Sequence, residues 1–125
     1  MHCLVNLHGG MELLTPPGER ETVFSQPGMR KWYLRAPVEQ GTCGWLYPVQ
    51  GVRAEYHYDA MKLPYLSYWE TRGGYRGDHN AALEPAACGF DSVAYALKAG
   101  PCPILQPHEE IGFAIEIQLA SMKTH

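Results

Sequence analysis

One stretch of this 125-residue chain, between positions 69 and 84, gathers the side chains best suited to bind or transform a small molecule. It places aromatic rings beside carboxylate, guanidinium, imidazole and amide groups, on either side of a glycine-rich run at 73–77. Ring faces stack on the C–H groups of a sugar, and the polar groups can bond to its hydroxyls. The stretch therefore predicts a carbohydrate site whose sugar-binding residues are Trp69, Arg72, Tyr75, Arg76, Asp78 and Asn80.

Glu84 is the candidate general base of this site. It stands between a leucine and a proline in an apolar segment, where partial burial would raise its affinity for a proton. His79 is the candidate acid in the same stretch. An equally weighted interpretation is structural, with Glu84 paired to Arg72 or Arg76 merely to hold the loop.

Two further clusters of polar residues are weaker candidates for a functional site. His57 and Asp59 are two apart on an expected strand, so they share one face that could hold a metal or a sugar hydroxyl, or simply be solvated. The run His-Glu-Glu at 108–110 is typical of a turn. A metal-dependent enzyme of the cupin type would need His57 with His79 or His108, but the His-x-His spacing of such sites is absent. We keep that alternative and predict no metal and no cofactor.

Short strands must position these groups. Apolar or aromatic residues alternate with polar ones most clearly at 52–59 and 111–119, and further strands are expected at 32–36, 43–49, 63–70 and 81–85. A single short helix is expected at 93–98, capped by Asp91 or Ser92 and closed by Gly100. The glycine-rich run reads as a flexible loop, and residues 1–30 as a strand or two with long connections or an irregular arm. The predicted class is mainly β, an antiparallel β-sandwich with one short helix.

Length, composition and charge narrow the classes of protein. A chain of 125 residues with 46% hydrophobic residues is expected to form one domain, 1–125. A net charge of −3 argues against nucleic-acid binding, and no segment approaches the ~18 apolar residues of a membrane span. The first residues lack the basic and apolar regions of a signal peptide, so we expect a cytoplasmic protein.

The four cysteines, at positions 3, 43, 88 and 102, are widely and irregularly spaced. The sequence has no Cys-x-x-Cys pair, which argues against a zinc ribbon. In a cytoplasmic protein we expect them to be reduced, packed thiols.

Several short motifs resemble the C-terminal part of galactose mutarotase-like proteins, the aldose 1-epimerases. The resemblance covers roughly residues 36–120, and the order and spacing of its pieces carry it more than any one piece. The motifs are Leu63-Pro64-Tyr65-Leu66-Ser67-Tyr68-Trp69, the glycine-rich loop, Ala82-Leu83-Glu84-Pro85, Phe90-Asp91-Ser92-Val93 and the turn Leu105-Gln106-Pro107-His108-Glu109-Glu110-Ile111-Gly112-Phe113. The usual glycine of that last turn is His108 here.

The resemblance implies part of a large, curved β-sandwich, a partial mutarotase-like supersandwich, that binds a sugar ring in a groove across its sheet. It also implies that Glu84 is the base that takes the anomeric proton, and that Trp69 is the aromatic residue before the loop. The family's histidine acid belongs to an N-terminal half that this sequence lacks, so His79 would be a substitute. Half of a sandwich would expose a sheet face and edges, which favours a homo-oligomer.

Three hypotheses remain open. The chain could be a short aldose 1-epimerase relative with Glu84 as base, a non-catalytic sugar-binding module, or an interaction domain that dimerises through its exposed sheet. We favour sugar binding, which the first two share, and expect a small-molecule sugar as the partner.

Overall fold

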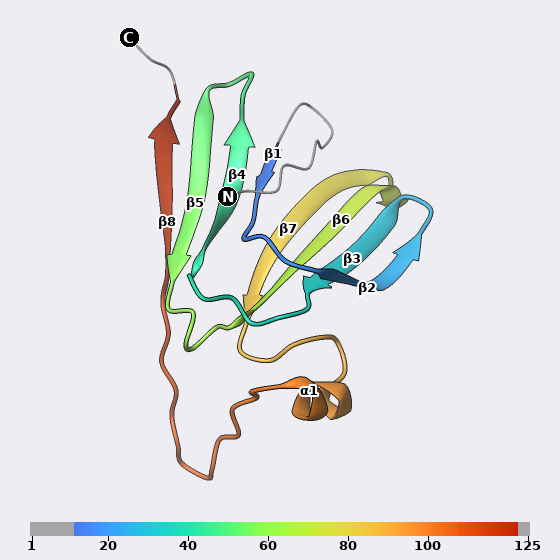
Figure 1. The fold of residues 1–125 in the computed structure, drawn as a ribbon. Helices are drawn as coiled ribbons and strands as arrows, with labels where there is room; N and C mark the ends of the chain where they lie inside the picture. Colours follow the sequence, from blue (N-terminus) through green and yellow to red (C-terminus); the bar gives the residue numbers. More distant parts are fainter. Residues whose placement is uncertain (1–11, 123–125) are drawn as a thin grey trace.

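The computed structural model describes residues 12–122, which form two four-stranded antiparallel sheets (Figure 1). Sheet A has the order β1-β4-β5-β8, with bounds Glu12–Leu14, Thr42–Tyr47, Val52–Tyr58 and Ile115–Ser121. Sheet B has the order β2-β3-β6-β7, with bounds Arg20–Gln26, Met29–Leu34, Tyr65–Tyr75 and Asp78–Ala86. A short helix, α1 (Val93–Ala99), lies between β7 and β8 in the chain. The predicted mainly β class is confirmed, and the arrangement is consistent with a β-sandwich.

The core lies between the sheets and is rich in aromatic rings. Trp32, Tyr68 and Leu83 contribute to it from sheet B, and Leu13 and Trp45 from sheet A. The ring of Tyr68 packs on both tryptophans, with centroids 5.3 Å from Trp32 and 6.2 Å from Trp45. Because successive residues of a strand point to opposite faces, each sheet also has an outer face, turned away from the other sheet.

The strands predicted from alternation are present, with shifted ends. The strand expected at 52–59 is β5, with the same start and one residue less. The strand expected from 111 begins only at Ile115, because its partner β5 ends at Tyr58 and the chain then turns. Asp59 makes that turn: its carboxylate accepts a hydrogen bond from the Met61 amide at 2.9 Å, and its carbonyl accepts from Leu63 at 3.0 Å.

The glycine-rich run is not the flexible loop that we expected. Strands β6 and β7 extend through it to a two-residue turn, Arg76-Gly77, in which both residues have positive φ angles of 51° and 76°. Such a turn matches the twist of the paired strands and closes a tight hairpin. Gly74 lies so close to the backbone of Gly28 that a Cβ there would be 2.6 Å from the Gly28 carbonyl oxygen.

For residues 1–30 we expected a strand or two with long connections or an irregular arm, and the described part, from residue 12, is largely ordered into strands. It contains β1, all of β2 and the start of β3. Strand β2 pairs with β3 and has a register shift between Thr22 and Phe24. That irregularity hides the period of two from sequence analysis. Residues 1–11 lie outside the described residues.

The helix is confirmed, and its surroundings correct the prediction for the cysteines. Ser92 caps α1, since its hydroxyl accepts a hydrogen bond from the Tyr95 amide at 3.3 Å. Cys88 and Cys102, 14 positions apart, form a disulfide that closes a loop around the helix, whereas Cys43 is a free, buried thiol. The expectation of reduced thiols is therefore wrong for this pair. With seven residues, α1 is too short to cross a membrane, and residues 12–122 contain no longer helix.

Candidate functional site

The structure does not bring the predicted base and acid together. Glu84 and His79 are both on β7 but five positions apart, so they point to opposite faces of sheet B and lie about 17 Å apart along the strand. Glu84 contacts Ser67 and Lys31 on the outer face. His79 lines a cleft between the two sheets. The chemistry of this region therefore divides into two places.

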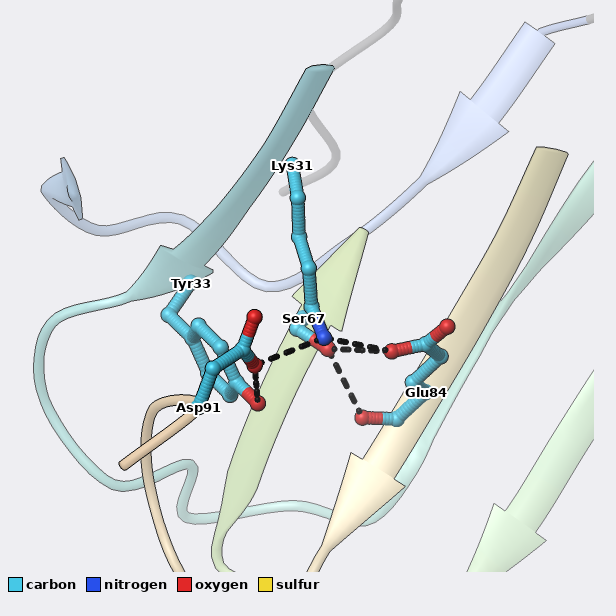
Figure 2. Close-up of polar contacts among 5 residues, drawn as sticks. All are labelled: Lys31, Tyr33, Ser67, Glu84 and Asp91. Atoms are coloured by element: carbon cyan, nitrogen blue, oxygen red, sulfur yellow. Dashed lines mark hydrogen bonds and ion pairs between the residues drawn. The ribbon is translucent and has the colours of Figure 1, made fainter. Parts of the chain in front are cut away.

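The first place is the Lys31 cluster, which comprises Lys31, Tyr33, Ser67, Glu84 and Asp91 (Figure 2). The Ser67 hydroxyl donates a hydrogen bond to Glu84 Oε2 at 3.0 Å, and Lys31 Nζ lies 3.3 Å from the same oxygen. Lys31 Nζ also donates to Asp91 Oδ1 at 2.8 Å, and the Tyr33 hydroxyl donates to that oxygen at 3.1 Å. One ammonium group thus holds two carboxylates, and the partner of Glu84 is Lys31, not Arg72 or Arg76 as the structural interpretation had it.

The Lys31 cluster has the properties of a structural ion-pair network. Burial alone would lower the pKa of Lys31, but the hydrogen bond to Asp91 and the charge of Glu84 outweigh it and raise that pKa, so the ammonium stays charged. Burial raises the pKa of Tyr33 as well, although the Lys31 charge opposes the shift. Ser67 is fully buried, with 0% exposure, so its hydroxyl cannot meet a substrate. What the cluster does is tie Asp91, at the start of the helical segment, to the outer face of sheet B.

The second place is the inter-sheet cleft, a cavity of about 480 Å³ with walls of different chemistry. Sheet A supplies an aromatic and aliphatic wall made of Trp45, Tyr47, Ala54, Tyr56 and Ile117. Sheet B supplies a mostly polar wall made of Glu70, Thr71, Arg72, His79, Asn80 and Ala81. A ligand in this cleft would meet ring faces on one side and hydrogen-bonding groups on the other.

Glu70 organises the polar wall. It is buried, and its carboxylate accepts a hydrogen bond from the Tyr68 hydroxyl at 2.8 Å. Arg30 Nε lies 2.5 Å from one of its oxygens and Arg72 Nε lies 3.5 Å from the other. Burial and the bond to Glu70 raise the pKa of Tyr68, so its hydroxyl remains a donor. Two guanidinium groups and one carboxylate give this group a formal charge of +1, and two of its members, Glu70 and Arg72, line the cleft.

The predicted sugar-binding residues are divided among three locations. Arg72 and Asn80 line the cleft together with His79. Trp69 lies on the outer face, because it alternates with the inward-facing Tyr68 and Glu70 and pairs in register with Lys31. The remaining residues are at the hairpin tip: Tyr75 and Arg76, with the guanidinium 5.0 Å from the ring centroid, and Asp78, which Arg76 Nη2 approaches to 3.4 Å.

Sequence reasoning missed the aromatic wall. Tyr56 belongs to the apolar and aromatic face of β5, which alternation predicted to be packed, whereas the opposite, polar face was expected to be solvated or to line a groove. Trp45 and Tyr47 come from β4. The cross-strand pairs Trp45–Ala54 and Tyr47–Val52 bring the two strands into one surface. The available signal was the shared aromatic content of two neighbouring strands, which a hairpin at 48–51 would place side by side.

The three histidines proposed for a cupin-type site are far apart in the fold. His57 is on the outer face of β5, with Nε2 3.7 Å from Glu55, whereas His79 lines the cleft. His108 is in an exposed turn and has a φ of 66°. Within residues 12–122 there is no group of three or more side chains that could ligate a metal ion.

Comparisons with known proteins add no relative. No protein-family model, no curated protein and no solved structure matches the chain. The resemblance to aldose 1-epimerases therefore stays a prediction.

Proposed function

We propose that this chain binds a small sugar in the inter-sheet cleft and does not turn it over. The observation that carries the proposal is the pairing of an aromatic wall with a polar wall across one cavity of about 480 Å³. Ligand sites usually measure about 300–1,000 Å³ and combine apolar lining with a few polar groups that fix orientation. A sugar ring has this same division, with C–H groups on its faces and hydroxyls at its edge.

The polar wall offers complementary partners for hydroxyl groups. A carboxylate has about four lone-pair sites and a guanidinium five donors, so Glu70 and Arg72 can bond to a ligand while bonding to each other. Since Tyr68 and Arg30 hold Glu70 in place, the polar wall is ordered before a ligand arrives.

The position of Glu84 supports binding without turnover. A base and an acid acting on one sugar must each lie within hydrogen-bond reach of it. Glu84 is engaged by Ser67 and Lys31 on the outer face, and His79 is on the other side of the sheet. The family mechanism of ring opening would need both groups on the same face.

Titration with monosaccharides tests the proposed binding. We would follow α-D-glucose, α-D-galactose and their uronic acids by calorimetry, with Tyr56→Ala as the cleft variant and Tyr75→Ala as the matched control at the hairpin tip. We expect Tyr56→Ala to weaken binding at least about tenfold, because it removes a stacking face, and Tyr75→Ala to leave it unchanged. Absence of binding to all four sugars, or equal losses in both variants, would refute the cleft as a sugar site.

Optical rotation tests the absence of turnover. Freshly dissolved α-D-glucose and α-D-galactose should approach equilibrium at the uncatalysed rate with wild type and with Glu84→Gln alike. Acceleration by wild type and not by Glu84→Gln would instead establish a mutarotase that uses Glu84 as its base.

Location in the cell remains part of the proposal. The sequence favours the cytoplasm, but the Cys88–Cys102 disulfide argues for an oxidising compartment, where such bonds persist. A sugar-binding protein is compatible with either.

A further inference from the structure

The four sheet edges of this fold are protected to very different degrees. Strand β1 has three residues within the described part of the chain, and β2 is irregular between Thr22 and Phe24. Strand β7 contains Pro85, which has no amide hydrogen to offer a further strand. Strand β8 pairs with β5 over all seven of its residues with no register shift, and no strand within residues 12–122 pairs with its other edge (Figure 1). Short, bulged or proline-bearing edges resist further pairing, and β8 is none of these.

The exposed surface of β8 is strongly apolar. Every residue of the strand is exposed, including Ile115 at 41%, Ile117 at 60% and Leu119 at 74%. These three side chains alternate along the strand and therefore form one stripe, on the face turned toward the cleft. The strand has a single charge, Glu116, and neither lysine nor proline. A long, regular, apolar edge of this kind is a site for pairing with another strand.

We propose that β8 pairs antiparallel with β8 of a second copy of this chain, about a two-fold axis at Ile117, to give a continuous eight-stranded sheet. In this register Ile117 faces its own copy and Ile115 faces Leu119 of the second copy. Glu116 faces Gln118, so the only charge of the strand meets an amide and no like charges oppose each other. A centre at Gln118 would instead place Ile115 against Ser121 and Glu116 against Ala120.

A second copy suits this edge because the strand is complementary to itself. Two-fold association requires that a surface match its own rotated image. The sequence Ile-Glu-Ile-Gln-Leu meets this requirement, with apolar residues opposite apolar residues and a carboxylate opposite an amide donor. As residues 12–122 show them, the other three edges are short, irregular or proline-bearing, so we expect association to stop at a dimer and not to continue into a polymer.

The dimer would also extend the cleft. Ile117 lines the cleft from β8, and antiparallel partners lie about 5 Å apart, so Ile117 of the second copy would border the same cavity. The pairing itself does not depend on a sugar. Failure of the proposed binding would leave the dimer unaffected, and the two results are therefore distinguishable.

Sedimentation equilibrium tests the pairing. We expect wild type to dimerise reversibly and Leu119→Lys to raise the dimer dissociation constant at least about tenfold, because two lysines would enter the apolar seam. Val49→Lys, in the turn between β4 and β5 and 79% exposed, is the matched control and should leave the constant unchanged. A wild type that stays monomeric at every accessible concentration would overturn the proposal and leave a strand of different sequence as the occupant.

Cysteine cross-linking tests the register, with wild type reporting the background from the cysteines that it already contains. Opposite residues at a two-fold axis have Cα atoms about 4.5–5.5 Å apart, a separation that a disulfide can bridge. Ile117→Cys should therefore form a covalent dimer under mild oxidation, and Leu119→Cys, displaced from its own copy by four positions, should not. Cross-linking of Leu119→Cys in place of Ile117→Cys would contradict this register, as would equal yields from both.

Discussion

The large side chains on the outer face of sheet B are buried, whereas those on the β8 end of sheet A are exposed. Tyr33 and Tyr65 on the outer face of sheet B are buried, because the segment at 88–102 folds back over them. A Cβ on Gly100 would come within 2.1 Å of the Tyr65 hydroxyl, so the cover fits closely. On β8, Ile117 and Leu119 are exposed. The same chain thus covers the outer face of sheet B with its own residues and leaves the apolar side chains of β8 exposed.

The two regions differ in whether a segment of the chain is held against the sheet. The segment at 88–102 is fixed covalently by its disulfide and electrostatically by Asp91, which Lys31 holds on sheet B. The chain that leads into β8, residues 101–114, forms neither helix nor strand. Apolar side chains do not by themselves order a covering segment. The conformational entropy that the segment loses must be offset, here by a disulfide and an ion pair.

Loss of the disulfide should have the largest effect on the covered region. We expect Cys88→Ser with Cys102→Ser to lower the free energy of unfolding by about 3 kcal/mol, since the bond closes a loop of about 15 residues. Urea unfolding measures the loss, and reductant should produce a comparable drop in wild type and none in the double variant. A loss below about 0.5 kcal/mol would mean that the cover is held without the bond.

Removal of the ammonium group of Lys31 should cost less. Lys31→Met leaves Glu84 and Asp91 facing each other without a counter-charge, and we expect a loss of about 1–2 kcal/mol in unfolding free energy because both carboxylates are partly solvated. Lys98→Met, on the exposed side of α1, is the control for simple loss of a charge. Equal losses of unfolding free energy in the two variants would show that the Lys31 cluster does not stabilise the fold.

The smallest expected effect is a pH dependence inside sheet A. Burial raises the pKa of the Cys43 thiol from 9.0 to about 12, although the Tyr58 hydroxyl opposes the shift. Above pH 9 the unfolded chain releases this proton while the folded chain keeps it until about pH 12, so stability falls with rising pH across that window. The loss between pH 9 and pH 10 is about 1 kcal/mol.

Two variants separate titration from packing at this position. Cys43→Val and Cys43→Ala differ in volume but neither titrates, so both should lose the same part of the alkaline decline. If either variant retains the full slope between pH 9 and pH 10, the thiol is not its source.

Local patterns in the sequence predicted much of the fold. Alternation located β5 almost to the residue, and Ser92 was one of two predicted caps of α1. The hairpin at 73–77 was mistaken for a flexible loop, because Arg76 adopts a positive φ that its residue type does not announce. Where structure follows from neighbouring residues, the sequence is sufficient.

The candidate site depended on distant pairings and was predicted only in part. Glu84 is 53 positions from Lys31, and the two meet only because β6 lies between β3 and β7. The same strand order, with alternation along β7, divides Glu84 from His79. The disulfide was missed because the spacing of its cysteines becomes meaningful only when α1 turns the chain back. Residue types suggested a sugar site, but the faces of the sheets decide which residues belong to it.

The disulfide also keeps the two parts of the chain covalently joined after cleavage between its cysteines. Cys88 follows β7 by two residues, and Cys102 begins the run of chain that leads to β8. A protease that cuts one peptide bond between them, for example in the exposed part of α1, would therefore release nothing. The nicked molecule would keep its full mass under non-reducing conditions and would separate into two fragments only when reduced.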